Sequence, residues 1–257
     1  MIVDIHTHIF PPSFAADRNA LCAREPRFAA MYRDPKAMMA TAEDLLASMA
    51  RAGVDVSVAC GFWWDDPALA MDHAMYIAEA AGASGGRLIP FVPTFREVPG
   101  ATGIGEVRVV TATEVPAVDR PLLLHCSEEV GHEYPGKAGG FSPGEVWRLL
   151  QAQPDVRVIA AHWGGGLPFF GLMPEMRQVI DADRVVFDSA ASSFLYTPEV
   201  FRAAIGLVGL PAVAWGSDFP LRSQSADLRD VRAALPDPEA RAAILGGNAA
   251  RFLRLHD

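Results

Sequence analysis

Two histidines separated by one residue open the part of the sequence that could carry chemistry. Asp4, His6 and His8 alternate with other residues in the segment Asp4-Ile5-His6-Thr7-His8. On a β-strand alternate side chains share a face, so we expect these three to point the same way. Two imidazoles about 7 Å apart along a strand can hold one ion, and neutral imidazole suits zinc and other transition metals. The alternative is a pair of strand histidines with ordinary hydrogen bonds.

Polar residues also end three later apolar segments of the chain. They are His125 after 121–124, His162 after 156–161 and Asp218 after 212–216. A buried imidazole or carboxylate needs a partner, and a shared metal ion would supply one to all of them. The pattern therefore predicts a site for one or two divalent metal ions, with zinc as the expected metal.

The elements that must position these residues alternate between strand and helix. Strands are expected at 2–8, 54–62, 87–93, 103–109, 121–127, 156–162, 184–188 and 212–217, and helices at 42–52, 67–82, 143–152, 171–182, 198–208, 224–234 and 238–255. Each strand is apolar nearly throughout, as in a parallel sheet covered on both faces. Eight such units predict a TIM (β/α)8 barrel in one domain, 1–257, whose active face lies at the C-terminal ends of the strands.

One feature of the sequence argues against the alternative fold, and another predicts an irregular barrel. A doubly wound open sheet would need a glycine-rich turn after its first strand, and Phe10-Pro11-Pro12 stands there instead. Only Arg96–Thr102 separate the third and fourth strands, and only about Thr111–Asp119 the fourth and fifth. A parallel crossover wants about a dozen residues, so we expect shortened third and fourth βα units.

Charge and composition reduce the classes of molecule that the protein is expected to bind. The net charge is −9 and no lysine or arginine stripe occurs, which argues against nucleic acid and anionic membranes. No apolar run approaches the ~20 residues of a membrane span. Three widely spaced cysteines and the lack of a signal peptide favour a cytoplasmic location. A small-molecule substrate is the expected partner. The sequence leaves open whether this substrate is anionic and whether the protein forms a homo-oligomer.

Four motifs give the sequence a family resemblance. They are D-I-H-T-H-I-F-P-P at 4–12, L-L-L-H at 122–125, A-H-W-G-G-G at 161–166 and W-G-S-D-F-P at 215–220. Together they resemble the amidohydrolase superfamily, in particular its aminocarboxymuconate-semialdehyde decarboxylase-like group. The resemblance spans nearly the whole chain.

The resemblance implies a role for each residue at a strand end. His6 and His8 match first-strand metal ligands, and His125 matches a fifth-strand ligand. His162 matches the sixth-strand histidine, which binds a second metal or contacts substrate or water. Asp218 matches the eighth-strand aspartate, which touches the metal and relays the proton of bound water.

Glu106 decides between one ion and two. Gly103-Ile104-Gly105-Glu106 closes the fourth strand and is similar to segments whose glutamate bridges two metals in some hydrolases of the superfamily. The alternative is that Glu106 pairs with Arg108, two residues on. A second ion would favour hydrolysis.

Three functions remain open from the sequence. The first is hydrolysis of an amide, lactone or ester by a metal-activated water, whose pKa falls to about 7, with Asp218 taking its proton and His162 polarising the carbonyl. The second is non-oxidative decarboxylation of a carboxylated ring or muconate-like acid. The third is metal binding without turnover, because of the shortened units.

Weaker signals each have two interpretations. Asp4 either orients a ligand imidazole or caps a backbone amide. His132, Tyr134 and Lys137 follow the fifth strand and either bind an anionic substrate or belong to a solvated loop. Arg222 either pairs with a substrate carboxylate or is a surface residue.

Overall fold

Eight parallel strands form the centre of the molecule in this computed structural model, which describes residues 1–108, 111–128 and 130–255. They are β1 (Val3–His8), β2 (Val56–Cys60), β3 (Leu88–Val92), β4 (Gly103–Val107), β5 (Leu122–Leu124), β6 (Val158–Ala160), β7 (Val185–Asp188) and β8 (Val213–Ala214). Each pairs with the next in chain order. The Ile5 amide donates to the Trp215 carbonyl at 3.0 Å and the Asp218 amide to the His6 carbonyl at 3.0 Å, closing the last strand onto the first. The predicted TIM barrel is confirmed.

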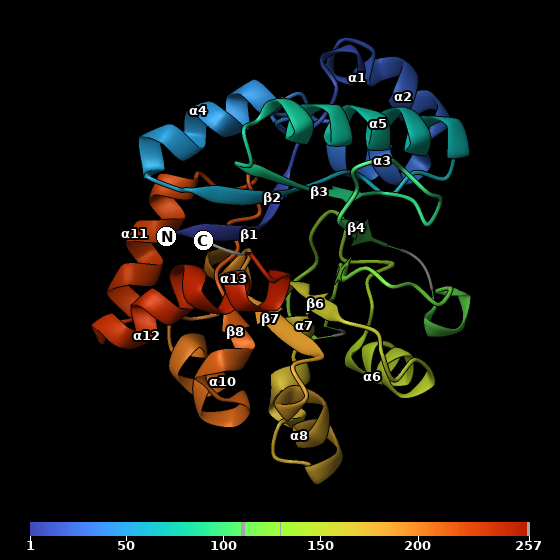
Figure 1. Cartoon of the computed structure of the whole chain (residues 1–257). Helices are drawn as coiled ribbons and strands as arrows, with labels where there is room; N and C mark the ends of the chain where they lie inside the picture. Colours follow the sequence, from blue (N-terminus) through green and yellow to red (C-terminus); the bar gives the residue numbers. More distant parts are fainter. Residues whose placement is uncertain (109–110, 129, 256–257) are drawn as a thin grey trace.

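Helices surround these strands (Figure 1). The outer helices are α4 (Ala42–Ala52), α5 (Pro67–Ala83), α6 (Pro143–Ala152), α8 (Pro174–Asp181), α10 (Val200–Val208) and α11 (Gln224–Ala234), followed by α12 (Pro238–Ala242), a π turn (Ala243–Gly247) and α13 (Asn248–Leu253). Local signals fix their ends: Thr41 and Asp44 form a capping box at the start of α4, and Gly53 ends that helix in the left-handed region. All seven predicted helical regions contain a helix, and the last is split into three pieces.

Apolar side chains fill two layers of core. The inner layer lies inside the barrel and takes residues from several strands, including Val58, Phe91, Leu123, Ile159, Val186 and Ala214. The outer layer lies between strands and helices and includes the neighbours Leu122 and Leu124. Leu123 therefore points inward, and on this alternation His125 also faces the barrel interior. A Cβ at Gly103 would overlap the Phe91 ring, so glycine on β4 makes room for it.

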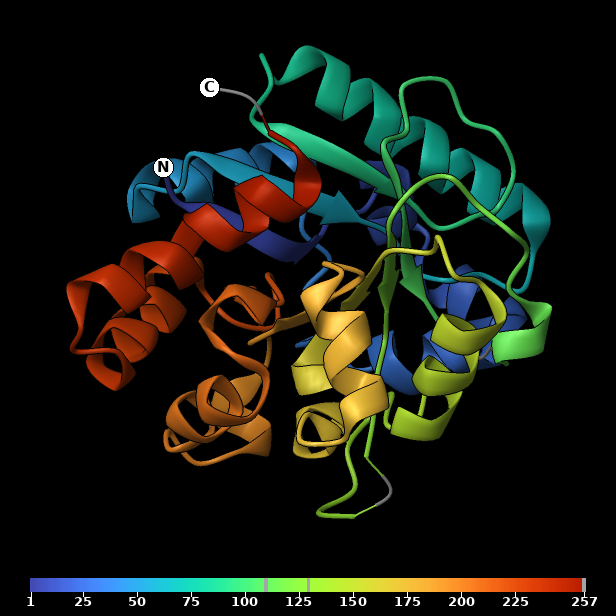
Figure 2. The ribbon, with the colours of Figure 1, turned by 60° about the horizontal axis from the view of Figure 1, so that its bottom comes forward.

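One quarter of the barrel lacks its covering helices (Figure 2, green). Residues 93–102, all described, contain no helix between β3 and β4. The described residues between β4 and β5 hold only the short 3-10 turn η1 (Ala112–Glu114). The predicted shortening of the third and fourth units is confirmed. Among the described residues, no helix combines the length and apolar composition that a membrane span needs.

The segment between β1 and α4 contains helices that the sequence analysis did not predict. These are α1 (Pro12–Ala16), α2 (Arg18–Arg24) and α3 (Pro26–Tyr32). Aromatic side chains pack around them. Phe28 of α3 stacks on Trp64 at 4.9 Å and on Tyr32 at 4.7 Å between ring centroids. Helices of five to seven residues show too little apolar periodicity to be read from sequence.

Two strands carry a register irregularity. Pairing of β1 with β2 shifts between Asp4 and Thr7, and pairing of β4 with β5 shifts between Ile104 and Val107. Such irregularities re-aim side chains next to functional sites. The Asp4 carboxylate accepts hydrogen bonds from the Ser217 amide at 2.9 Å and from Gln224 of α11 at 2.8 Å. Its partners are therefore a backbone amide and an outer helix, whereas Asp188 is the carboxylate that contacts a histidine ring.

Candidate metal centre

The first group of polar side chains meets where β1 and β8 end. His6 Nε2 and His8 Nε2 lie 3.1 Å apart. Asp218 Oδ1 lies 3.3 Å from His8 Nε2 and 3.7 Å from His6 Nε2. Two atoms bound at about 2.1 Å to the same ion lie about 3.0–3.4 Å apart. These three atoms therefore have nearly the spacing of one face of a coordination shell.

A second group surrounds the carboxylate of Glu106. Its Oε1 lies 2.9 Å from His125 Nδ1 and 3.6 Å from both His162 Nε2 and His6 Nε2. Its Oε2 lies 3.7 Å from His8 Nε2. Glu106 thus stands between the first group and the His125–His162 pair. The structure brings together all six residues that the sequence predicted for the site. Four are almost fully enclosed, and the side chains of His8 and Asp218 are 11% and 13% exposed.

Hydrogen bonds on the far side of three rings decide which nitrogen faces the site. His6 Nδ1 lies 2.9 Å from Asp188 Oδ2, His125 Nε2 3.0 Å from the Gly136 carbonyl, and His162 Nδ1 3.2 Å from the Ala190 carbonyl. Carboxylate and carbonyl oxygens only accept, so these nitrogens donate. The opposite nitrogen of each ring faces the cluster, as in histidines that ligate metals.

The chemistry of this donor set fits a divalent cation. Burial first, and then Arg108, lower the pKa of His125 to about 4, so its Nδ1 carries a lone pair at neutral pH. That lone pair faces the Glu106 carboxylate at 2.9 Å, and positive charge close to both groups offsets their repulsion. Burial opposes a charge on His6, but Asp188 and Asp218 outweigh it and raise its pKa to about 10. The cluster thus favours positive charge at its centre.

Asp188, at the end of β7, was missed by the sequence analysis. Its Oδ2 accepts from His6, and its Oδ1 accepts from the His162 amide at 2.8 Å and the Ala190 amide at 3.0 Å. Asp188 therefore orients a ligand imidazole, the role suggested for Asp4. Asp4 instead accepts hydrogen bonds from the backbone amides of His6 and Ser217. The signal was present, because the predicted strand 184–188 also ends in a polar residue.

A pocket of about 480 Å³ opens above the cluster. Its lining combines the metal-competent residues with aromatic and basic side chains, among them Tyr32, Lys36, Phe62, Arg108, His132, Tyr134 and Phe194. Arg108 Nε donates to Glu106 Oε2 at 2.9 Å and its Nη1 to the Gly136 carbonyl at 3.2 Å. Arg108 outweighs the effect of burial and, with His125, holds the pKa of Glu106 well below its usual range.

The weaker candidates divide between pocket and scaffold. His132 and Tyr134 line the pocket. Lys137 instead donates to the carbonyls of Val130 and His132 at 3.1 and 3.0 Å, so it holds its own loop together. Arg222 pairs with Asp227 at 3.2 Å and also with Asp230, and it does not line the pocket.

Two site residues adopt a backbone conformation that side chains disfavour. His162 has φ 55° and Asp218 has φ 58°, and Trp163 beside His162 has φ 57°. Left-handed residues other than glycine cost roughly 1–2 kcal/mol each and cluster at functional sites. The glycines at 164–166 continue the left-handed run, and a Cβ at Gly165 would come within 2.8 Å of the Ser127 backbone.

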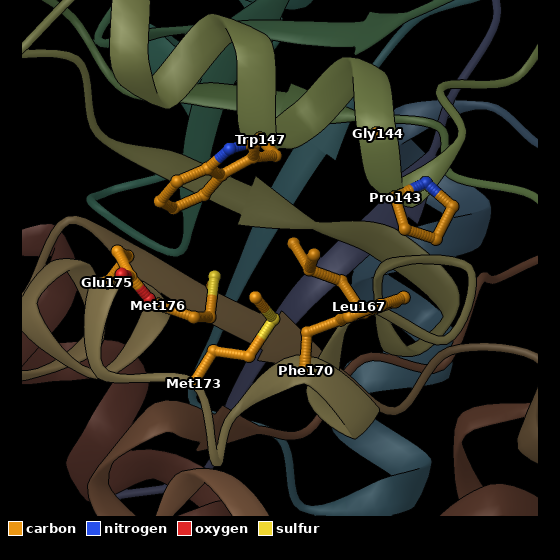
Figure 3. A pocket seen from close by; sticks show the side chains of 8 residues that line it. All are labelled: Pro143, Gly144, Trp147, Leu167, Phe170, Met173, Glu175 and Met176. Atoms are coloured by element: carbon orange, nitrogen blue, oxygen red, sulfur yellow. The ribbon is translucent and has the colours of Figure 1, made fainter.

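A second pocket, of about 440 Å³, lies between α6 and α8 on the outside of the barrel (Figure 3). Its walls are Pro143, Gly144, Trp147, Leu167, Phe170, Met173, Glu175 and Met176. Only one of these side chains carries a charge, and none is a histidine or cysteine. This pocket lacks the convergent polar groups that chemistry requires.

Comparison with known proteins places these features in context. The family model described as amidohydrolase matches residues 3–255. Among solved structures, 5-carboxyvanillate decarboxylase from Novosphingobium aromaticivorans, with bound manganese and 4-hydroxy-3-methoxy-5-nitrobenzoic acid, is 13% identical, with 99% of this chain and 96% of that chain covered and a TM-score of 0.73. The 5-carboxyvanillate decarboxylase from Sphingomonas paucimobilis is 14% identical, with 99% of each chain covered and a TM-score of 0.71. IDCase from Metarhizium anisopliae is 20% identical, with 100% of this chain and 98% of that chain covered and a TM-score of 0.65. No curated protein sequence matches the chain.

Proposed function

The chain belongs to the amidohydrolase family, and from this membership we propose that it is a metal-dependent decarboxylase of a small aromatic or unsaturated carboxylic acid. The observation that carries the proposal is the position of Arg108 in the 480 Å³ pocket, beside Glu106 and the histidine cluster. A guanidinium has five N–H donors, so Arg108 can pair with a substrate carboxylate while it keeps its hydrogen bonds to Glu106 and Gly136. Two of the compared proteins are named as decarboxylases of an aromatic acid, which supports decarboxylation over the hydrolysis that the sequence analysis ranked first.

The pocket lining suits such a substrate. Tyr32, Phe62 and Phe194 offer faces and edges for a flat ring. Its volume lies within the usual 300–1,000 Å³ of small-molecule sites. An acid whose ring lies among these side chains can direct its carboxylate toward Arg108 and the metal-competent residues.

His6, His8 and Asp218 would hold the ion, and the family resemblance adds His125 as a further ligand, with Glu106 beside them. A bound divalent ion would supply Lewis-acid stabilisation of the substrate's oxygens. Manganese is present in one of the compared proteins, and zinc remains a prediction for this chain, as do its cytoplasmic location and its oligomeric state.

The remaining chemistry falls to the protein's own side chains. Decarboxylation breaks the bond between the ring carbon and the carboxyl carbon, releases carbon dioxide and leaves the electron pair on the ring carbon, which takes up a proton. Burial would raise the pKa of Asp218, but His6 and His8 outweigh it and lower that pKa, so Asp218 is ionised and can relay the proton. Burial opposes a proton on His162, but Glu106 and Asp218 outweigh it and raise its pKa. His162 can therefore stabilise negative charge that develops on the substrate.

Hydrolysis stays the second candidate because of one observation. Glu106 Oε1, His125 Nδ1 and His162 Nε2 form a second set of donors beside the first. Two ions there would favour water activation and attack on an ester, lactone or amide, again with Asp218 as the base.

A substrate panel separates these candidates. Protein loaded with Mn²⁺ or with Zn²⁺ is incubated with hydroxylated and methoxylated benzoates, with unsaturated dicarboxylates, and with esters and lactones. We expect carbon dioxide release and proton uptake with at least one carboxylic acid, and both should be strongly reduced in Asp218→Asn. Hydrolysis of an ester or lactone, without carbon dioxide release from any acid, would contradict the proposal. Metal uptake with no turnover would favour the third function, metal binding alone.

A further inference from the structure

The two oxygens of Glu106 have different partners. Oε1 faces the ring nitrogens of His125 at 2.9 Å and of His162 and His6 at 3.6 Å. Oε2 accepts a hydrogen bond from Arg108 Nε at 2.9 Å, and it is also the oxygen nearest His8 Nε2, at 3.7 Å. A carboxylate that bridges two ions gives one oxygen to each. Here Oε2, the oxygen beside His8, is already occupied by a guanidinium, and only Oε1 faces His6, His125 and His162 without that partner.

Arg108 is fixed in that position. Its side chain is only 13% exposed, and its Nη1 donates to the Gly136 carbonyl at 3.2 Å. The same carbonyl accepts from His125 Nε2 at 3.0 Å, so one backbone oxygen holds both the arginine and a candidate ligand. A guanidinium also keeps its charge at any pH that a protein experiences.

The charges of the enclosed groups point the same way. The cluster contains three carboxylates, those of Glu106, Asp188 and Asp218, each at most 13% exposed. One divalent ion together with Arg108 balances them. A second divalent ion would leave an excess of two positive charges among groups shielded from water, where uncompensated charge is costly.

We propose that Arg108 takes the electrostatic place of a second metal ion and thereby holds the site at one ion per chain. The inference rests on the metal site of the proposed function, but not on which reaction runs there. It assigns the choice between one and two ions to a residue that is not itself a ligand. Loss of the guanidinium frees Glu106 Oε2 and leaves one negative charge that a second cation can compensate.

The test uses Mn²⁺ alone as the probe. Metal-free wild type, Arg108→Met and Arg108→Lys are each titrated with Mn²⁺, and bound metal per chain is measured by elemental analysis after removal of free ions. We expect one ion in wild type, two in Arg108→Met, which keeps the length of the side chain without its charge, and one in Arg108→Lys. Electron paramagnetic resonance gives a second readout, because two Mn²⁺ ions bridged by one carboxylate show exchange coupling that a single ion cannot show.

Glu106→Gln combined with Arg108→Met provides the matched control. Without an ionised bridging carboxylate, this double variant should return to one uncoupled ion. Two ions in wild type would overturn the inference, and so would one ion in a folded Arg108→Met protein. If Arg108→Met does not fold, as judged by circular dichroism, Arg108→Gln takes its place, and two bound ions are again expected. Wild type titrated with excess Mn²⁺ should still saturate at one ion. No bound metal in wild type would refute the metal site itself, and with it the proposed function.

Discussion

Two pockets of similar size lie on this barrel and differ in what lines them. The inner pocket, about 480 Å³, collects side chains from the C-terminal ends of several strands. The outer pocket, about 440 Å³, lies between α6 and α8 and is walled by residues such as Trp147, Met173 and Met176 (Figure 3). Hollow shape alone therefore does not mark a site. Strand ends converge on one point and bring buried polar groups within 4 Å, whereas two helices that pack side by side leave only an apolar gap.

The strongest test of the difference between the two pockets removes the two candidate metal ligands on β1. His6→Ala combined with His8→Ala should reduce bound metal to none, because two of the three atoms in the first group disappear. Elemental analysis after incubation with Mn²⁺ measures the change. Met176→Ala in the outer pocket is the matched control and should bind metal as wild type does. Normal metal content in the double variant would move the site elsewhere.

Asp218→Asn should have the next largest effect. The amide keeps the shape of the side chain but cannot take or relay a proton, so kcat should fall about 10²–10⁴-fold. Thermal unfolding should show that the variant is folded. Turnover like that of wild type, on any substrate that the panel identifies, would remove Asp218 from the mechanism.

His162→Asn should act more weakly, and on turnover alone. We expect a loss of about 10²-fold in kcat, as for removal of one group that stabilises developing charge, with one ion still bound. Metal content and kcat are measured on the same preparation. If the ion is lost as well, His162 is a ligand, and the cluster is organised around the second group of donors.

The smallest effect is expected in the outer pocket. Met173 is 51% exposed there, so Met173→Ala should change the free energy of unfolding by less than about 0.5 kcal/mol and leave kcat and bound metal unaltered. Urea unfolding and the assay identified by the panel measure both quantities. A clear drop in kcat would show that the two pockets are coupled and would weaken the contrast between them.

The sequence allowed prediction of the barrel and of the six residues that meet in its site, because both follow from local patterns. The bounds of α4, α6 and α11 match those predicted, since capping residues such as Thr41 and Ser142 mark where helices begin. Strand ends in a parallel barrel share one face, so polar residues after apolar runs could be placed together without knowing the packing.

What could not be predicted depends on register and on contacts between distant segments. The shift in strand pairing between Asp4 and Thr7 is invisible in the sequence, and so are the hydrogen bonds that Asp4 accepts from Ser217 and Gln224. Asp188 ends an apolar strand as His125 and Asp218 do, but its role depends on hydrogen bonds to His6 and to the amide of His162, which strand ends alone do not reveal. The single carbonyl of Gly136 that holds both Arg108 and His125 comes from a loop whose path no local pattern reveals.

The left-handed backbone at His162 implies that activity and stability oppose each other at that position. Glycine adopts φ 55° without a steric penalty, whereas any other side chain there carries roughly 1–2 kcal/mol of conformational energy. His162→Gly should therefore unfold at a higher temperature than His162→Ala, by an amount equivalent to about 1 kcal/mol, although both lack the imidazole.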